Sequence, residues 1–236
     1  MTSPLGVQLY SVRDDIGPDA LPQTLARLAG FGFTHVEPYD ILTDTDGLAA
    51  ALAASGLSAT TAHAKITELD RDRVLDAAER LGVRTVVVPF VPPASIADRA
   101  GVEALAEAIN EASAYAAARG IRIGYHNHDF EFAQTVGGRP VYELLVERLE
   151  PAVVLELDTY WAAVGGADVY ELVPRLGDRV RLLHVKHDAG NPFDIADVLP
   201  LAASLELPVV EVVVHEGDVF PLVEQNAHYF GGLVRA

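Results

Sequence analysis

The sequence predicts an α/β protein with a single domain, a (β/α)8 TIM barrel over residues 1–236. Three observations support this fold. Eight short apolar runs of strand type recur along the chain, segments with helical patterning lie between them, and 236 residues suit one barrel domain. Strands that alternate with helices every ~25 to 35 residues indicate βαβ units and a parallel sheet.

A doubly wound open sheet is the structural alternative. It usually has fewer strands, and its nucleotide-binding versions carry a glycine-rich turn after the first strand. The corresponding turn here is LYSVRDD, which contains no glycine. The barrel is therefore favoured.

The eight expected strands are short and mostly apolar. In chain order they cover residues 6–10 (GVQLY), 33–39 (FTHVEPY), 57–63 (LSATTAH), 84–90 (RTVVVPF), 121–126 (IRIGYH), 153–158 (VVLELD), 181–186 (RLLHVK) and 208–214 (PVVEVVV).

Helical patterning is clearest in residues 20–32, 70–82 and 95–120, and the last of these is rich in Ala, Leu and Glu. Asp70 and Ser95 stand where helix N-caps belong. Glycines at positions 32, 56, 82 and 120 are expected to end helices, because glycine commonly follows the last helical residue.

Charge and composition exclude several classes of partner and site. The formal net charge is −17, which opposes binding to nucleic acid or to anionic lipid. The absence of cysteine excludes disulfides, zinc-thiolate sites and thiol nucleophiles. The N-terminus lacks the pattern of a signal peptide, and no apolar run approaches the ~18 residues of a membrane span. We therefore expect a cytoplasmic protein that binds neither nucleic acid nor membrane.

Polar residues gather at the carboxyl ends of the expected strands, where barrel enzymes carry their active sites. All of these ends except that of the fourth strand contain polar or titratable side chains: Gln8, Tyr10, His35, Glu37, His63, His126, His128, Glu156, Asp158, His184, Lys186 and Glu211. Because side chains alternate along a strand, Glu156 shares the inner face with Asp158, while the neighbouring leucines face the helices.

A single histidine or glutamate at a strand end is usually a capping or rim residue. We expect His187, His215 and Glu216 to be solvated loop residues and His228 to be a structural residue of the last helix.

Three residues, Asp158, His184 and Glu211, are harder to explain as rim residues, because they occupy matching points of three successive strands. Burying carboxylates together is costly unless a cation compensates them. Carboxylate and imidazole ligands without thiolate fit one divalent ion, Mn²⁺, Mg²⁺, Co²⁺ or Zn²⁺. Glu156 and His63 are candidates for partners that orient these ligands.

The strand ends HVEPYD, TTAHAKI, GYHNHDFEF, LELDTYWAAVGG, LLHVKHD and VVEVVVHEGD, with the opening GVQLYSVRDD, resemble the sugar phosphate isomerase/epimerase family of xylose-isomerase-like barrels. The resemblance spans essentially the whole chain. It implies one divalent metal held at the ends of strands five to eight, with Asp158, His184 and Glu211 as the last three ligands. The first ligand is open. His126 stands where sugar epimerases of the family carry glutamate, and the related inosose dehydratases have a similar histidine-rich cluster there. Glu131 is a second candidate.

The implied chemistry is abstraction of a proton next to the carbonyl of a keto-sugar or keto-polyol. Glu211 is expected to act as ligand and base, with His128 or Glu131 as the partner acid/base. Lys186 is expected to stabilise the developing oxyanion. Epimerisation, isomerisation and dehydration of the inosose dehydratase type all remain open.

Four further residues are expected to contact substrate: Arg13, Glu37, His63 and Trp161. Arg13 and Lys65 are the only early cations that are candidates for binding a phosphate, and the late loop VHEGD is acidic, so we expect a sugar without a phosphate group. The resemblance leaves a homodimer open, since barrels of this type often dimerise.

Two other function classes fit the sequence less well. An endonuclease-IV-like phosphodiesterase would need more metal ligands and a basic groove, which the charge of −17 disfavours. A non-catalytic sugar-binding barrel would be expected to lack a ligand, whereas Asp158, His184 and Glu211 are all present.

Overall fold

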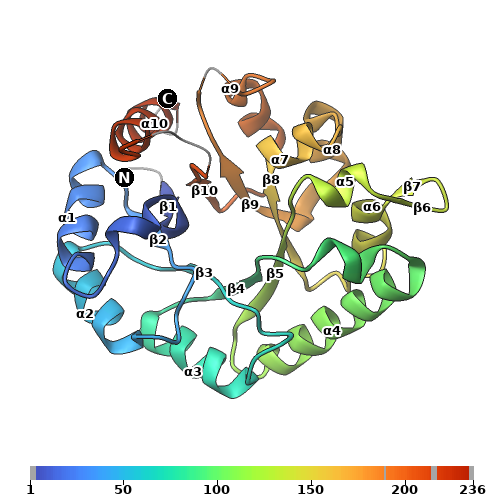
Figure 1. Cartoon of the computed structure of the whole chain (residues 1–236), viewed down its shortest axis with the longest axis horizontal. Helices are drawn as coiled ribbons and strands as arrows, with labels where there is room; N and C mark the ends of the chain where they lie inside the picture. Colours follow the sequence, from blue (N-terminus) through green and yellow to red (C-terminus); the bar gives the residue numbers. More distant parts are fainter. Residues whose placement is uncertain (1–3, 189, 214–216, 234–236) are drawn as a thin grey trace.

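The computed structural model describes residues 4–188, 190–213 and 217–233. Its core is a sheet of eight parallel strands in the order β2-β1-β10-β9-β8-β5-β4-β3, with the helices as an outer ring (Figure 1). The strands are β1 (Gly6–Gln8), β2 (His35–Glu37), β3 (Thr61–His63), β4 (Thr85–Val88), β5 (Arg122–His126), β8 (Val154–Asp158), β9 (Val180–Val185) and β10 (Leu207–Val210). The predicted α/β barrel is confirmed.

The barrel closes between β2 and β3 through a few hydrogen bonds instead of a continuous ladder. The Val36 N–H donates to the Ser58 carbonyl (2.9 Å), and the His63 N–H donates to the Pro38 carbonyl (2.8 Å). A single parallel bridge joins His35 to Ser58. This seam brings Glu37 and His63, the last residues of β2 and β3, to the same end of the barrel.

The helices cover the outer face of the strands. They are α1 (Leu21–Phe31), α2 (Thr45–Ser55), α3 (Arg71–Leu81), α4 (Arg99–Ala117), α5 (Phe130–Ala133), α6 (Val141–Val146), α7 (Thr159–Val164), α8 (Val169–Leu176), α9 (Ile195–Val198) and α10 (Phe220–Leu233), with 3-10 turns η1 (Leu9–Asp15), η2 (Pro93–Ile96), η3 (Gly177–Arg179) and η4 (Leu199–Leu201). Within the described ranges, none of these helices has the length and apolar character needed to cross a membrane.

Most of the predicted helix boundaries are confirmed. Asp70 caps α3, since its Oδ1 accepts a hydrogen bond from the Arg73 N–H (3.1 Å). Glycines 32, 56 and 82 follow α1, α2 and α3 with φ of 102°, 74° and 81°, a left-handed conformation that other residues adopt only with strain.

The prediction that Ser95 caps the long helix is wrong. Asp98 is the cap, and its Oδ1 accepts from the Gly101 N–H (2.8 Å). Ser95 belongs to η2, where its hydroxyl donates to the Pro92 carbonyl (2.7 Å). Prolines at the start of η2 fix a separate turn, so the α-helix begins only at Arg99.

The core has two apolar layers separated by the strands. Inside the barrel, Val87, Leu182, Leu207 and Val209 pack together, while Leu183 packs outward among the helices. Because alternate residues share a face, His184 follows Leu182 on the inner face and Glu211 follows Val209. A polar level therefore lies directly above the inner apolar cluster, toward the carboxyl ends of the strands.

Two features differ from the expected elements. The eighth ladder ends at Val210, so Glu211 lies one residue beyond it, although its N–H still donates to the Val185 carbonyl (3.1 Å). A short hairpin, β6 (Thr135–Val136) and β7 (Arg139–Pro140), interrupts the connection after β5. The Gly-Gly pair at 137–138, with positive φ at both residues, is the sequence signal for this turn.

Candidate functional site

Polar side chains from seven strands meet at the carboxyl end of the barrel. The parallel register places His126 beside Glu156 and Asp158 beside His184, so inward-facing residues of neighbouring strands are adjacent. Most of these side chains are closed to solvent. The members that are at most 5% exposed are Gln8, Glu37, His63, His126, Glu156, Asp158 and His184.

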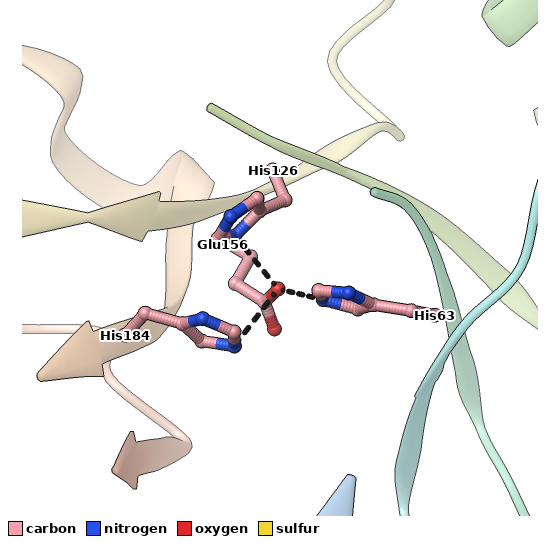
Figure 2. Close-up of side chains that lie close together, drawn as sticks. All are labelled: His63, His126, Glu156 and His184. Carbon is pink, nitrogen blue, oxygen red and sulfur yellow. Dashed lines mark hydrogen bonds and ion pairs between the residues drawn. The ribbon is translucent and has the colours of Figure 1, made fainter. Parts of the chain in front are cut away.

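The deeper part of this cluster, which we call the inner layer, consists of Glu37, His63 and Glu156 with Nε2 of His184. Glu156 Oε2 lies 2.6 Å from His63 Nε2 and 3.2 Å from His184 Nε2 (Figure 2). Glu37 Oε1 lies 2.8 Å from His184 Nε2 and 3.1 Å from His63 Nε2. Gln8 Nε2 also donates to Glu37 Oε1 (2.9 Å). The inner layer is a closed network of carboxylates and imidazoles.

The charges of the inner layer compensate one another. Burial opposes ionisation of Glu37, but His63 and His184 nevertheless hold its pKa well below the usual range. Burial likewise opposes a charged His63, yet Glu37 and Glu156 raise its pKa to about 10. Burial and the neighbouring Glu37 charge raise the pKa of Glu156. Paired charges are the form in which such groups persist inside a protein.

A second set, the outer group, lies nearer the mouth and contains His126, Asp158, His184 and Glu211. One potential ligand atom from each lies within 4.8 Å of all the others. His184 belongs to both sets, because its Nδ1 lies 3.1 Å from Glu211 Oε2 while its Nε2 faces Glu37 and Glu156. Metal-binding histidines are commonly held by carboxylates on one ring nitrogen, as Glu37 and Glu156 hold Nε2 here, while the other nitrogen faces the ligand group.

The donor set of the outer group fits a divalent cation. Burial, then the charges of His184 and His63, hold the pKa of His126 well below its usual value, so its imidazole is neutral. Burial and the neighbouring Glu211 raise the pKa of Asp158. His126 Nδ1 lies 3.3 Å from Glu156 Oε2 without forming a hydrogen bond (Figure 2), and the buried Glu156 Oε1 has no hydrogen-bond partner in the described residues. Unpaired buried donors and acceptors are costly, and a bound cation would compensate the carboxylates.

Asn127 is a part of this site that the sequence analysis missed. It is fully buried; its Nδ2 donates to the Asp158 carbonyl (3.1 Å), and its Oδ1 accepts from the Asp158 N–H (3.0 Å). Asp158 also caps α7, since its Oδ1 accepts from the Trp161 N–H (2.7 Å). These bonds fix the Asp158 carboxylate at the mouth. The sequence signal that could have indicated Asn127 is its position between His126 and His128 at the end of a strand.

The structure places Glu131 outside the outer group. Glu131 is fully buried in α5, where its Oε1 accepts from the Tyr125 hydroxyl (2.8 Å) and its Oε2 from the His128 N–H (2.9 Å). Tyr125 faces away from the barrel axis, because its neighbour His126 faces inward. Burial raises the pKa of Glu131 to about 7. Glu131 therefore braces the loop after β5. Two groups of potential ligands occur in the described residues, the outer group and the set His63, His126, Glu156 and His184; His126 belongs to both and Glu131 to neither.

Two predicted catalytic residues do lie beside the outer group. The His128 ring is 5.1 Å from that of His126 and lines the large cavity described below. Lys186 is 7% exposed, and its Nζ lies 3.0 Å from Asp188 Oδ2 and 3.5 Å from the centroid of the Tyr160 ring. Its ammonium is thus held at the edge of the site.

The four predicted substrate contacts are distributed unevenly. His63 lines the large cavity, and Trp161 lines a narrow crevice of ≈10 Å³ together with Asp158 and Glu211. The expectation for Glu37 needs correction, because it is fully buried in the inner layer. Arg13 also lies elsewhere: it donates to the Tyr10 carbonyl (3.0 Å) and borders a neighbouring cavity of ≈280 Å³.

The remaining predicted histidines lie away from the site. His187, expected to be solvated, stacks on Tyr229 with ring centroids 3.6 Å apart. His228, expected to be structural, is exposed on α10. His215 and Glu216 lie outside the described residues.

Comparison with known proteins gives one family and a set of similar folds. The family of xylose isomerase-like TIM barrels matches residues 25–197. No significant match is found among proteins of curated function. A sugar phosphate isomerase/epimerase from Parabacteroides distasonis superposes with a TM-score of 0.88 at 24% identity, over 98% of this chain and 94% of that one.

Two other structures with the same fold contain bound molecules. D-allulose 3-epimerase from Methylomonas sp., in complex with D-allulose, gives a TM-score of 0.74 at 16% identity, over 98% of this chain and 97% of that one. A xylose isomerase-like barrel from Mycobacterium smegmatis, in complex with magnesium, gives a TM-score of 0.74 at 15% identity, over 99% of this chain and 97% of that one. At these identities the similarity establishes the fold alone.

Proposed function

Because this chain belongs to the xylose isomerase-like TIM barrel family, we propose that it is a divalent-metal-dependent isomerase or epimerase of a keto-sugar or keto-polyol. The observation that carries the proposal is the outer group, in which two carboxylates and two imidazoles from β5, β8, β9 and the end of β10 converge within 4.8 Å. The similar folds of a sugar phosphate isomerase/epimerase and a D-allulose epimerase support this reaction class.

In this proposal His126, Asp158, His184 and Glu211 hold the ion, which is Mn²⁺, Co²⁺, Mg²⁺ or Zn²⁺. A bound ion of this kind acts as a Lewis acid on a carbonyl and makes the adjacent C–H group more acidic. Glu37 and Glu156 keep His184 oriented through its Nε2. Asn127 and the α7 cap do the same for Asp158.

Proton transfer is assigned to groups that face the large cavity. Glu211 lines this cavity and is the base. Burial opposes ionisation of its carboxyl group, but the adjacent His184 lowers the pKa of Glu211 and keeps it ionised. His128 lines the same cavity and is the partner acid/base. Lys186 supplies positive charge at the edge of the site for the developing oxyanion. Glu131 holds the backbone of His128 and acts only by positioning it.

Dehydration of the inosose dehydratase type is the second candidate. The observation that favours it is the pair His126 and His128, with rings 5.1 Å apart. Burial lowers the pKa of His128, so this imidazole is neutral and suited to removing the proton whose loss precedes departure of a hydroxyl group.

The test is solvent exchange. The Mn²⁺-loaded protein is incubated in D₂O with keto-sugars, inososes and 3-keto-glycosides, and the products are examined by NMR and mass spectrometry. We expect deuterium at the carbon next to the carbonyl, and the product then separates epimerisation from isomerisation and from loss of water. Turnover without deuterium, or no effect of EDTA on turnover, would refute the proposal.

Metal binding should release protons. Without a cation the pKa values of Asp158 and His184 are raised, so both side chains hold protons near neutral pH. Each must lose a proton to become a metal ligand. Both groups are protonated below their raised pKa values, so affinity for Mn²⁺ should increase as pH rises from about 6 to 8. At pH 7 we expect roughly one to two protons released per ion. Calorimetry in two buffers of different ionisation enthalpy measures this number, and Asp158→Asn should lower it; a pH-independent affinity would contradict the assignment.

A further inference from the structure

The cavity above the outer group is much larger than the metal-binding cluster needs. It has a volume of ≈560 Å³ and extends from Glu211 and the three histidines at 63, 126 and 128 to the loops that follow β1, β2, β3 and β4. Its size lies within the ~300–1,000 Å³ range of pockets that hold drug-sized ligands. It therefore has one polar end and a long extension away from it.

The extension is walled by apolar and aromatic side chains. Tyr10 and Tyr39 meet edge to face with ring centroids 5.2 Å apart. Phe90, from the loop after β4, meets the His128 ring edge to face, with ring centroids 5.4 Å apart. Tyr10, Leu69 and Phe90 are 40%, 45% and 37% exposed, which makes them three of the seven large exposed hydrophobic residues in the described part of the chain. Their concentration around one opening indicates a binding surface.

The charged groups of the extension do not suit an anion. Among the described lining residues there is one lysine, Lys65, and no arginine, and Asp40 and Glu211 add negative charge. The Lys65 ammonium lies 3.9 Å from Glu68 and 6.0 Å from the Phe90 ring centroid. Arg13 stacks on Tyr10, with its guanidinium carbon 4.7 Å from the ring centroid, but it borders the neighbouring cavity. A phosphate in the extension would therefore be held by a single exposed lysine. A second free sugar is also disfavoured, because its hydroxyl groups would lose water against walls that offer few partners.

We propose that the substrate is a keto-sugar glycoside whose aglycone is a neutral aromatic ring. The sugar lies against the outer group, and the aglycone packs on Tyr10, Tyr39 and Phe90. The inference rests on the proposed function only in placing the sugar end at the outer group. Aromatic rings bury large apolar areas and pack favourably edge to face, which is the contact that these side chains already make with one another.

The test compares two unreactive probes, phenyl and methyl glucopyranoside, as both anomers, with the full chain in the presence of Mn²⁺. Isothermal titration calorimetry gives their dissociation constants. We expect phenyl glucopyranoside, in at least one anomer, to bind about tenfold or more tightly than the methyl compound, from burial of the ring. Equal affinities, binding of neither probe, or equally tight binding of phenol alone would overturn the inference.

Variants locate the contact. Phe90→Ala and Tyr39→Ala, on two different loops, should each reduce the ratio of phenyl to methyl glucopyranoside affinity severalfold. Phe90→Leu is the conservative replacement if alanine impairs folding. Tyr115→Ala is the matched control, because Tyr115 is a 43% exposed aromatic residue on α4, outside the cavity. An unchanged preference in the folded Phe90 and Tyr39 variants would overturn the inference.

The outcome is independent of turnover. A phenyl preference in a protein that exchanges no deuterium with any keto-sugar would support the cavity assignment and refute the proposed reaction. Deuterium exchange with free keto-sugars, without a phenyl preference, would support the reaction and refute the aglycone site.

Discussion

Glu211→Gln is expected to reduce deuterium exchange into substrate by about 10²–10⁴-fold, the usual contribution of a general base. Glutamine keeps the shape of the side chain but removes the charge next to His184 Nδ1, 3.1 Å away. Glutamine is a neutral ligand in place of a carboxylate, so affinity for Mn²⁺ should also fall. Exchange is measured by NMR in D₂O at saturating Mn²⁺, so that the loss of base is separated from the loss of ion.

The variant should stay folded, because Glu211 lies just beyond the end of β10 and its backbone N–H still bonds to Val185. Glu107→Gln is the matched control, since Glu107 is an exposed glutamate on α4. The control should retain full exchange activity and Mn²⁺ affinity. Undiminished exchange in Glu211→Gln would remove Glu211 from its assigned role.

Glu37→Ala is expected to lower the free energy of unfolding by about 3–5 kcal/mol, the cost of breaking a buried charge pair. One carboxylate oxygen of Glu37 lies within 3.1 Å of both His63 and His184, and it also accepts from Gln8. Without it, these groups stay buried with one partner fewer, although His63 and His184 keep Glu156. Urea denaturation of the EDTA-treated protein measures the change. Glu37→Gln, which keeps an oxygen acceptor, should cost less.

A double-mutant cycle separates this network from simple loss of volume. If Glu37 and His63 stabilise each other, the double variant Glu37→Ala/His63→Ala should cost less than the sum of the single changes, by about 0.5–3 kcal/mol. Strictly additive costs, or an unchanged urea midpoint for Glu37→Ala, would contradict the described pairing.

Local patterns were sufficient to predict the barrel and the convergence of three residues. Eight apolar runs alternate with helices, and the period of two along each strand gives the side chains that face inward. In a parallel sheet the ends of successive strands are adjacent, so Asp158, His184 and Glu211 had to lie together. This placement does not depend on how the sheet closes.

The inner layer depends on that closure and was not predictable. Glu37 and His184 are 147 residues apart, and they touch only because β2 and β9 face each other across the barrel. Glu37 was therefore expected to contact substrate, while the structure encloses it. The direction of Glu131 was equally inaccessible, because α5 is a single four-residue turn that points it toward Tyr125. The aromatic cavity was not predicted, because Phe90 carries no titratable or metal-ligating group that would mark it in the sequence.

The hydrogen bond between Asp158 and the Trp161 N–H has a practical consequence. Trp161 is the only tryptophan in the chain, so ultraviolet emission excited at the indole band has a single source. The side chain borders the crevice formed by Asp158, His184 and Glu211, and its backbone is held by the carboxylate that the proposed ion would bind. Quenching or a spectral shift of this emission would follow occupancy of the outer group directly. The fold thus contains an intrinsic optical reporter at its own site, usable without any label.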